Sequence, residues 1–294
     1  MAYDVKKVAS AGAELVQYGC VDSTGYFIGG TGTAPVAGNA AGLPLLTLEG
    51  VKNFPFVPNA PERLTVTGDD GAIAQFLWNP IELPSGDTTF SVSDQDFAAL
   101  AMSTLVHDLG GYSFVGIQPG DVTYRDLCFL VTARAVSRTT ASAGSSMYYN
   151  YLIMKANAFY QGRDAFAERA EAAFIYNLIA NRASNYPWGL AFSDANNGDD
   201  DFVVMEFTSG YKPTMHAFTG NNTETTFTPL GKNVAEDSAN NVLAYVNGAA
   251  ITWATGAPGA GEFGITEGAG ATDTIVFGTA PAASAKVVVL YGYS

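Results

Sequence analysis

Residues 63–78, RLTVTGDDGAIAQFLW, decide the fold class of this chain. Apolar and polar residues alternate on both sides of the Asp69-Asp70-Gly71 segment. An Asp-Gly pair between two alternating runs is a strong signal for a tight turn that joins antiparallel strands. The stretch therefore predicts a β-hairpin. Most of the remaining chain has the same extended character, so we expect a mainly β protein.

One amphipathic helix should follow this hairpin within residues 93–106, SDQDFAALAMSTLV. Its apolar positions are Phe97, Leu100, Ala101 and Leu105. Their spacing of three or four residues places them on one face of a helix. Ser93 or Asp94 can cap the first turn. We expect this helix to cover one face of the sheet.

The composition indicates an uncharged surface and enough chain for two domains. The 294 residues are 48% hydrophobic, and only 14% are charged. Charge is depleted where subunits meet, so a protein whose faces are mostly interfaces has this composition. A secreted sandwich with a Thr, Ser and Asn surface explains it equally well. Ser209-Gly210 and Pro213 interrupt the strand-rich sequence, so we predict one domain over residues 1–212 and another over residues 213–294.

The net charge of −14 argues against a protein that grips nucleic acid, because phosphate binding requires Lys or Arg. The sequence contains no apolar run of membrane-spanning length, and residues 1–12 lack the apolar core of a signal peptide. We therefore expect a soluble protein that is made in the cytosol and has no membrane partner. Cys20 and Cys128 are too few for a disulfide framework and are expected to be free and buried.

Further strands are predicted from the alternation along the chain. Residues 18–28 form a candidate strand, and residues 29–44 form a loop or an arm. Residues 126–136, DLCFLVTARAV, are apolar on both faces, as in a central strand that is covered on both sides. Residues 147–159 should return as its hairpin partner. Residues 163–183 fit helical and strand periods alike, and the pattern alone favours a helix for the Ala-rich first half and leaves the rest open.

The C-terminal region predicts a small sandwich. About seven short strands fall between residues 217 and 291, and Asn247-Gly248 is the strongest short hairpin signal in the chain. Seven short strands in about 80 residues are typical of a β-sandwich.

The residues offer no catalytic, cofactor or metal site. His107 and His216 stand without a Cys or His at metal-ligand spacing, and His107 has no nucleophile motif before it. Residues 199–201, DDD, lack the alternation of a calcium loop and are expected to be a solvated turn. We therefore expect no enzyme and no cofactor.

The aromatic residues of one predicted strand allow two interpretations. These residues are Tyr148, Tyr149, Tyr151, Phe159 and Tyr160. They could form an interface patch or a stacking platform for sugars or bases. Burial within the strand explains them equally well.

Several motifs resemble the major tail tube protein of long-tailed bacteriophages. They are residues 62–71 (ERLTVTGDDG), residues 82–86 (ELPSG) leading to residues 97–100 (FAAL), and residues 184–192 with Pro187-Trp188-Gly189. The C-terminal region is similar to small immunoglobulin-like sandwiches that are appended to phage tail and fibre proteins. Its matching motifs are residues 218–220 (FTG), 225–228 (TTFT), 245–248 (YVNG) and 279–291 (TAPAASAKVVVLY).

The resemblance implies a tail-tube-type β-barrel or sandwich with one flanking helix and a C-terminal sandwich. It implies hexameric rings, stacked into the tail tube of a virion that assembles in the host cytoplasm. A tape-measure protein would occupy the channel, tail terminator and distal tail proteins would meet the ends, and genomic DNA would pass without specific binding. It also favours a strand over residues 171–181. Residues 29–59 and 137–146 are candidates for arms between rings.

Candidate subunit contacts follow from this reading. They are Asp69, Asp70, Arg138, Tyr148, Tyr149 and Tyr151. A receptor-binding or fibre protein, or a capsid-decoration protein, is the alternative, in which the C-terminal sandwich would adhere to surfaces or carbohydrate. We expect residues 1–212 to form tubes without residues 213–294, since the second domain should hang outside.

Overall fold

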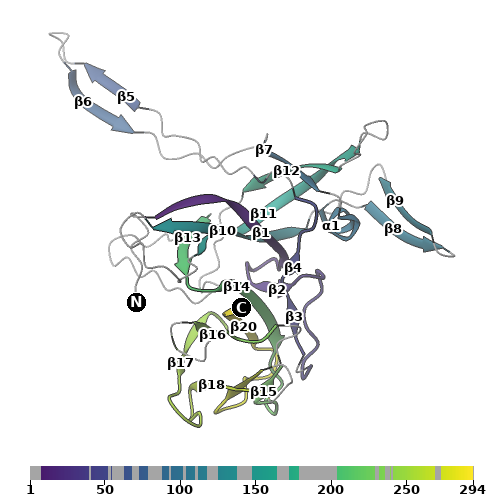
Figure 1. The fold of residues 1–294 in the computed structure, drawn as a ribbon, viewed down its shortest axis with the longest axis vertical. Helices are drawn as coiled ribbons and strands as arrows, with labels where there is room; N and C mark the ends of the chain where they lie inside the picture. The colour runs from purple at the N-terminus through teal and green to yellow at the C-terminus, as the bar shows by residue number, and fades with distance from the viewer. Residues whose placement is uncertain are drawn as a thin grey trace.

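The chain is mainly β, as the sequence predicts, with two curled sheets (Figure 1). The computed structural model describes residues 8–39, 41–51, 54, 63–67, 73–78, 88–92, 94–101, 104–109, 112–117, 125–137, 148–163, 172–178, 204–228, 232–235, 239, 241–268 and 273–293. These residues include one helix, α1 (Gln95–Ala101).

The first sheet is built around a long antiparallel hairpin. Its strands are β1 (Val8–Val21), β2 (Phe27–Gly29), β4 (Leu46–Thr47), β7 (Thr88–Val92), β10 (Asp126–Ser137), β11 (Tyr148–Arg163), β12 (Ala172–Leu178) and β13 (Val204–Ser209). The main order is β2-β1-β10-β11-β12-β7, with β4 on β1 and β13 on β11. The predicted hairpin of residues 126–136 and 147–159 is therefore confirmed.

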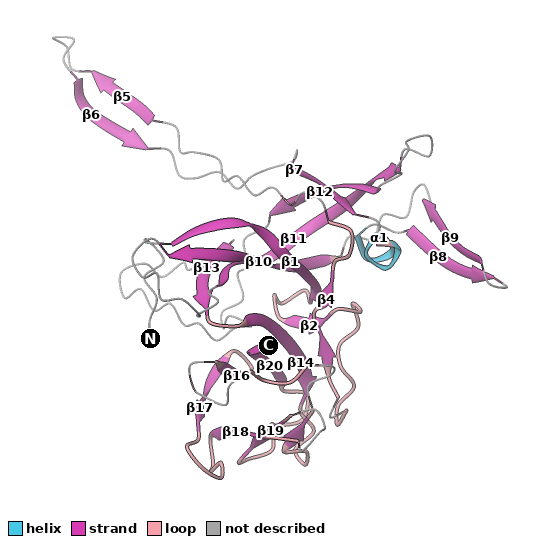
Figure 2. Cartoon of the chain, in the orientation of Figure 1, coloured by secondary structure: helices cyan, strands magenta, loops and turns pink. Residues whose placement is uncertain are grey.

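The central strand β10 is covered on both faces, as predicted. Leu127 and Phe129 belong to one core, whereas Cys128 and Leu130 belong to another, and all four are fully buried. Neighbouring residues of a strand point to opposite faces, so an uninterrupted apolar run requires a layer on each side. One layer contains α1 and the other is the second sheet (Figure 2).

Helix α1 begins at the predicted cap. The backbone N–H of Phe97 donates to Oδ1 of Asp94 at 2.9 Å, which satisfies a free donor of the first turn. The fully buried Phe97 ring lies 4.9 Å from both Tyr18 and Phe174. The helix is shorter than predicted, because Leu105 lies in strand β8 (Thr104–Leu109) rather than on the helical face.

The second sheet contains the predicted C-terminal strands and one strand from the N-terminal part. Its order is β15-β19-β18-β17-β16-β20-β14-β3. The strands are β3 (Leu43–Pro44), β14 (Lys212–Thr219), β15 (Thr226–Phe227), β16 (Val242–Val246), β17 (Ala249–Trp253), β18 (Glu262–Thr266), β19 (Thr274–Phe277) and β20 (Lys286–Tyr293). The predicted Asn247-Gly248 turn joins β16 to β17, and both of its residues have positive φ.

The second sheet curls around its own core. Phe227, Phe263 and Phe277 from one part of the sheet pack with Val287 and Tyr291 of β20. The described strands thus enclose an apolar interior, but an immunoglobulin-like topology for this region remains a prediction.

One segment differs from its sequence prediction, and the structure decides another that the sequence left open. The strand predicted at residues 18–28 is the end of β1, a turn and β2, because Asp22 accepts hydrogen bonds from the N–H groups of Thr24 and Tyr26. The open segment 163–183 contains strand β12, which pairs with β7 and β11. Its alternation describes a strand with Phe174, Tyr176 and Leu178 buried on one face.

Candidate subunit interface

Two hairpins form separate two-stranded sheets. Strand β5 (Arg63–Thr67) pairs with β6 (Ile73–Trp78), and β8 pairs with β9 (Tyr112–Ile117), each in antiparallel register. Neither pair joins the larger sheets, and Figure 1 shows β5 and β6 lying away from both of them. The predicted hairpin is therefore confirmed. Its turn residues Asp69 and Asp70, like Arg138, lie outside the described residues.

The candidate tyrosines of β11 divide between the two faces of the first sheet. Tyr149 and Tyr151 have ring centroids 5.0 Å apart. Tyr149 is buried, and its hydroxyl donates to the carboxylate of Glu206 on β13. Burial, together with the Glu206 carboxylate, raises the pKa of Tyr149. Tyr149 therefore supports the sheet within its own chain, while half-buried Tyr148 points toward the second sheet, beneath Lys212.

A polar bond network crosses between the two sheets. Gln17 on β1 donates through Nε2 to the Pro213 carbonyl at 2.8 Å and accepts from Oγ1 of Thr214 at 2.8 Å. Gln17 and Thr214 are both buried. Unpaired buried polar groups are costly, so these bonds fix how β14 lies on β1. Around them, Leu130, Leu152 and Met154 of the first sheet pack with residues Met215, Ala217 and Val288 of the second.

Residues 27–48, which we call the strap, connect the two sheets. Strand β3 pairs with β14, and β4, two residues later, pairs with β1. Between them, the N–H of buried Leu45 donates to the Met215 carbonyl at 2.9 Å. The predicted ring-bridging arm of residues 29–59 is therefore bound within its own chain at Gly38 and over residues 43–48.

The turn between β1 and β2 is bound to the second sheet by Lys286, a contact that we call the Lys286 latch. Nζ of Lys286 lies 2.5 Å from Oδ2 of Asp22 and 2.8 Å from Oγ1 of Thr24. The same Nζ lies 4.4 Å from the centre of the Tyr26 ring. Burial alone would raise the pKa of Asp22, but the hydrogen bonds from Lys286, Thr24 and the turn backbone hold it below its usual value.

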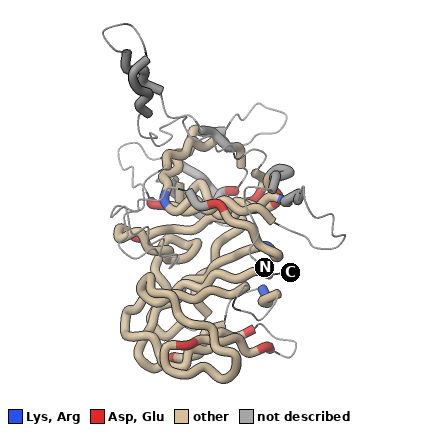
Figure 3. Tube along the Cα trace, turned by 90° about the vertical axis from the view of Figure 1, so that its left-hand side faces the viewer, with Lys and Arg blue, Asp and Glu red and all other residues tan. Residues whose placement is uncertain are grey.

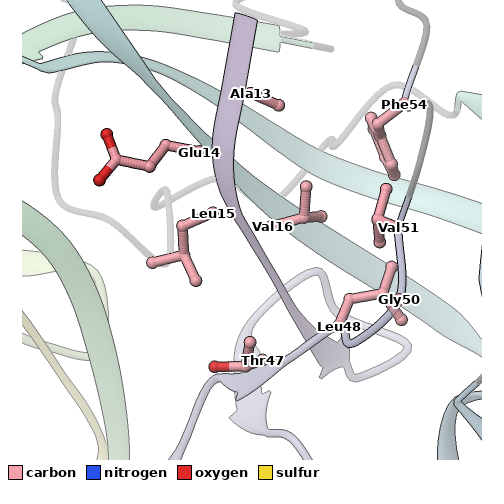
Figure 4. Close-up of a pocket in the computed structure, with 9 residues that line it drawn as sticks. All are labelled: Ala13, Glu14, Leu15, Val16, Thr47, Leu48, Gly50, Val51 and Phe54. Carbon is pink, nitrogen blue, oxygen red and sulfur yellow. The ribbon is translucent and has the colours of Figure 1, made fainter.

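A cavity of about 400 Å³ lies beside the outer edge of β1 (Figure 4). Val16, Val51 and Phe54 line one side of it, while Glu14 points away from them (Figure 4). The N–H of Leu48 donates to the Val16 carbonyl at 2.8 Å, after which the two segments diverge. Among the described strands, β1 has no partner on this edge before Val16.

The histidines and cysteines do not form a reactive site in the described part of the chain. His216 is buried, and its Nδ1 lies 3.2 Å from the Tyr291 hydroxyl. His107 lies opposite Phe114 in the β8–β9 hairpin. Cys20 and Cys128 are free and buried, as predicted, and burial raises the pKa of Cys20 to about 11. The described residues contain no cluster of three or more metal-ligating side chains and no helix that could cross a membrane.

The strap and the polar network between the sheets could not be read from the sequence. The frequent glycines were the only sign of such packing in the sequence, because a backbone that lies directly against a neighbouring side chain leaves no room for a Cβ. A Cβ on Gly19 would lie 2.4 Å from the Phe27 ring, and one on Gly42 would lie 2.4 Å from the Phe218 ring.

No protein-family model matches the sequence, and no curated protein matches it significantly.

Proposed function

We propose that the chain is a structural protein of a phage virion that assembles with copies of itself into stacked rings. The stack forms the tail tube, the channel for DNA delivery. The motifs of residues 62–71, 82–86 and 184–192 support the family, and the mainly β fold with one flanking helix is compatible with it. Its other partners are a tape-measure protein in the channel and the terminator and distal proteins at the tail ends.

The observation that carries the proposal is the pair of separate hairpins. An isolated two-stranded hairpin is marginally stable in water, so β5–β6 needs a surface to cover it, whereas β8–β9 already lies against α1. Copies of the same chain can provide that surface, since strand edges pair readily with other edges. The net charge of −14 suits a channel through which DNA moves without being held.

Electron microscopy of the purified full-length chain tests the proposal. We expect rings or tubes in negative stain, either from the chain alone or after mixing with other tail components. A chain that stays monomeric at high concentration under both conditions would overturn the proposal.

A hairpin variant tests the observation behind it. Replacing residues 62–79 with a short Gly-Ser linker should abolish ring formation and leave the thermal unfolding of the two sheets unchanged. The double variant Asp69→Asn, Asp70→Asn keeps turn-forming residues but removes both candidate contact charges, so loss of assembly in this variant as well would assign the contact to these charges rather than to the strands. Normal tubes from the linker variant would show that the hairpin is not a subunit contact.

A further inference from the structure

Basic and aromatic side chains gather where the two sheets meet, on a chain with twice as many acidic as basic residues. We name this group the seam patch. It consists of Arg134 on β10, Lys212 on β14, Lys232, Tyr148 on β11 and Tyr293 on β20, with Glu14 of β1 among them. Five strands from both sheets therefore build one surface.

Glu14 connects two cations of the seam patch. Its Oε1 lies 2.8 Å from Nζ of Lys212, and its Oε2 lies 3.6 Å from Nε of Arg134. The hydrogen bond from Lys212 lowers the pKa of Glu14, so this carboxylate is ionised at neutral pH. One negative charge thus faces two positive charges.

Lys232 adds a third positive charge. Its Nζ lies 3.7 Å from the centre of the Tyr293 ring, and Lys212 lies above the Tyr148 ring at 5.9 Å. Burial and the neighbouring Lys212 lower the pKa of Lys232. The described residues supply Lys232 with no carboxylate partner. Among the described residues, the patch therefore has three cations and the one carboxylate of Glu14, which makes this surface positive.

The patch is open to a partner on its outer side. The Arg134 side chain is 70% exposed and that of Lys212 is 31% exposed. The strands that carry these two side chains are held by the shared core, so their backbones keep a fixed arrangement. Fixed arrangements lower the entropic cost of binding.

The opposite end of the second sheet is acidic. Glu224 precedes β15, Glu262 begins β18 and Glu267 follows it. Figure 3 shows Asp and Glu segments gathered at this end of the molecule, away from the Lys and Arg segments near the C-terminus. We name these three residues the acidic end.

We propose that the seam patch of one copy binds the acidic end of a second copy, so that subunits join head to tail. Copies that each carry a net charge of −14 repel one another, and a local match of opposite charges sets where they can meet. A head-to-tail contact uses two different surfaces and therefore produces rings or filaments. This inference rests on the proposed self-assembly and names the charged surfaces that direct it.

Charge reversal tests the contact by analytical ultracentrifugation of the full-length chain. The patch variant Arg134→Glu, Lys232→Glu should weaken self-association by about tenfold or more. The end variant Glu224→Lys, Glu267→Lys should do the same. The control for the Arg134→Glu change is Arg125→Glu, the same single charge reversal on an exposed residue just before β10, which should associate normally.

Mixing the two variants gives the sharpest result. The reversed patch of one variant matches the reversed end of the other, so an equimolar mixture should assemble although neither variant does alone. Neutral variants Arg134→Gln and Lys232→Gln serve if a reversed variant fails to fold, and their association should lose its dependence on salt concentration.

Four results would overturn the contact. If the wild type associates and both reversal variants associate equally well, self-assembly stands but this contact does not direct it. A mixture that stays dissociated excludes complementary pairing. Patch variants that instead lose binding to a single-stranded DNA oligonucleotide, measured by fluorescence anisotropy, would assign the patch to nucleic acid. A wild-type chain that never associates would remove the proposed function as well.

Discussion

At the scale of single residues, the packing between the two sheets depends on the absence of side chains. Gly42, with φ of +61°, lies against the Phe218 ring and the Ala217 carbonyl. A Cβ there would come within 2.4 Å of the ring and 2.7 Å of the oxygen. This position therefore combines a left-handed backbone with a close approach, and both conditions favour glycine.

Gly42→Ala should lower the free energy of unfolding by about 1–3 kcal/mol, from overpacking and from strain at positive φ. Urea unfolding followed by circular dichroism measures the change. The control is Gly256→Ala, because a Cβ on Gly256 meets nothing within 4 Å. Equal stability of the two variants would mean that the strap does not need this close contact.

At the scale of elements, the β1–β2 turn and strand β20 are joined by the Lys286 latch. The pKa of Asp22 is lowered in the fold, as is that of Glu14 in the seam patch. The folded chain thus binds fewer protons than the unfolded chain at mildly acidic pH. The stabilisation is complete above the ordinary carboxyl pKa and is lost as the pH falls through the lowered values.

Thermal stability should therefore fall steeply below about pH 4, where unfolded carboxyl groups take up protons. Asp22→Asn should unfold at a lower temperature than the wild type at neutral pH and should show a weaker dependence on acid. Melting curves between neutral and acidic pH measure both effects. Identical pH profiles for the variant and the wild type would exclude the latch as a source of stability.

Local patterns predicted elements whose own residues carry a period. Alternation identified β10 and the β5–β6 hairpin, and Asp94 identified the start of α1. The end of α1 was wrong because Leu105 suits the apolar face of a helix and an extended strand alike. The Ala-rich and Phe-rich sequence of β12 fits both periods, so only the resemblance favoured a strand there, and the pairing with β7 and β11 confirms it.

No local sequence pattern could predict which residues pair when they lie far apart in the sequence. Strand β3 consists of only two residues, which carry no period, and its partner β14 lies far along the chain. Among the candidate contacts, Tyr149 shows the same limit. A tyrosine in a strand gives no sign that its hydroxyl will be bound by Glu206, a residue 57 positions away.

At the scale of the whole molecule, the two sheets are not independent units. They share a buried layer that includes Cys128, Leu130 and Met154 from one sheet and residues Met215 and Val288 from the other. The predicted division at Pro213 runs through β14, whose first residue is Lys212. The second sheet thus covers one face of the first, and the division into two domains stays a prediction.

Deleting residues 213–294 should therefore unfold or aggregate the first sheet, in place of the intact tubes expected from the sequence. Each core side chain left exposed loses about 2 kcal/mol of burial, and buried Gln17 loses both its partners. Circular dichroism and size-exclusion chromatography of the truncated chain measure the outcome. A soluble truncation with a cooperative melting transition would show that the first sheet stands alone.

The strap also determines the order in which the molecule can fold. Gln17 bonds to Pro213 and Thr214 across 196 and 197 positions, and β3 can dock only once β14 exists. Contacts so distant in sequence form late, because closing the intervening loop costs entropy first. Until then, one edge of β14 is unpaired, and the strap of a neighbouring chain can pair with it in place of the strap of the same chain. Refolding at high concentration should thus yield dimers with exchanged straps, and dilution during refolding is the way to avoid them.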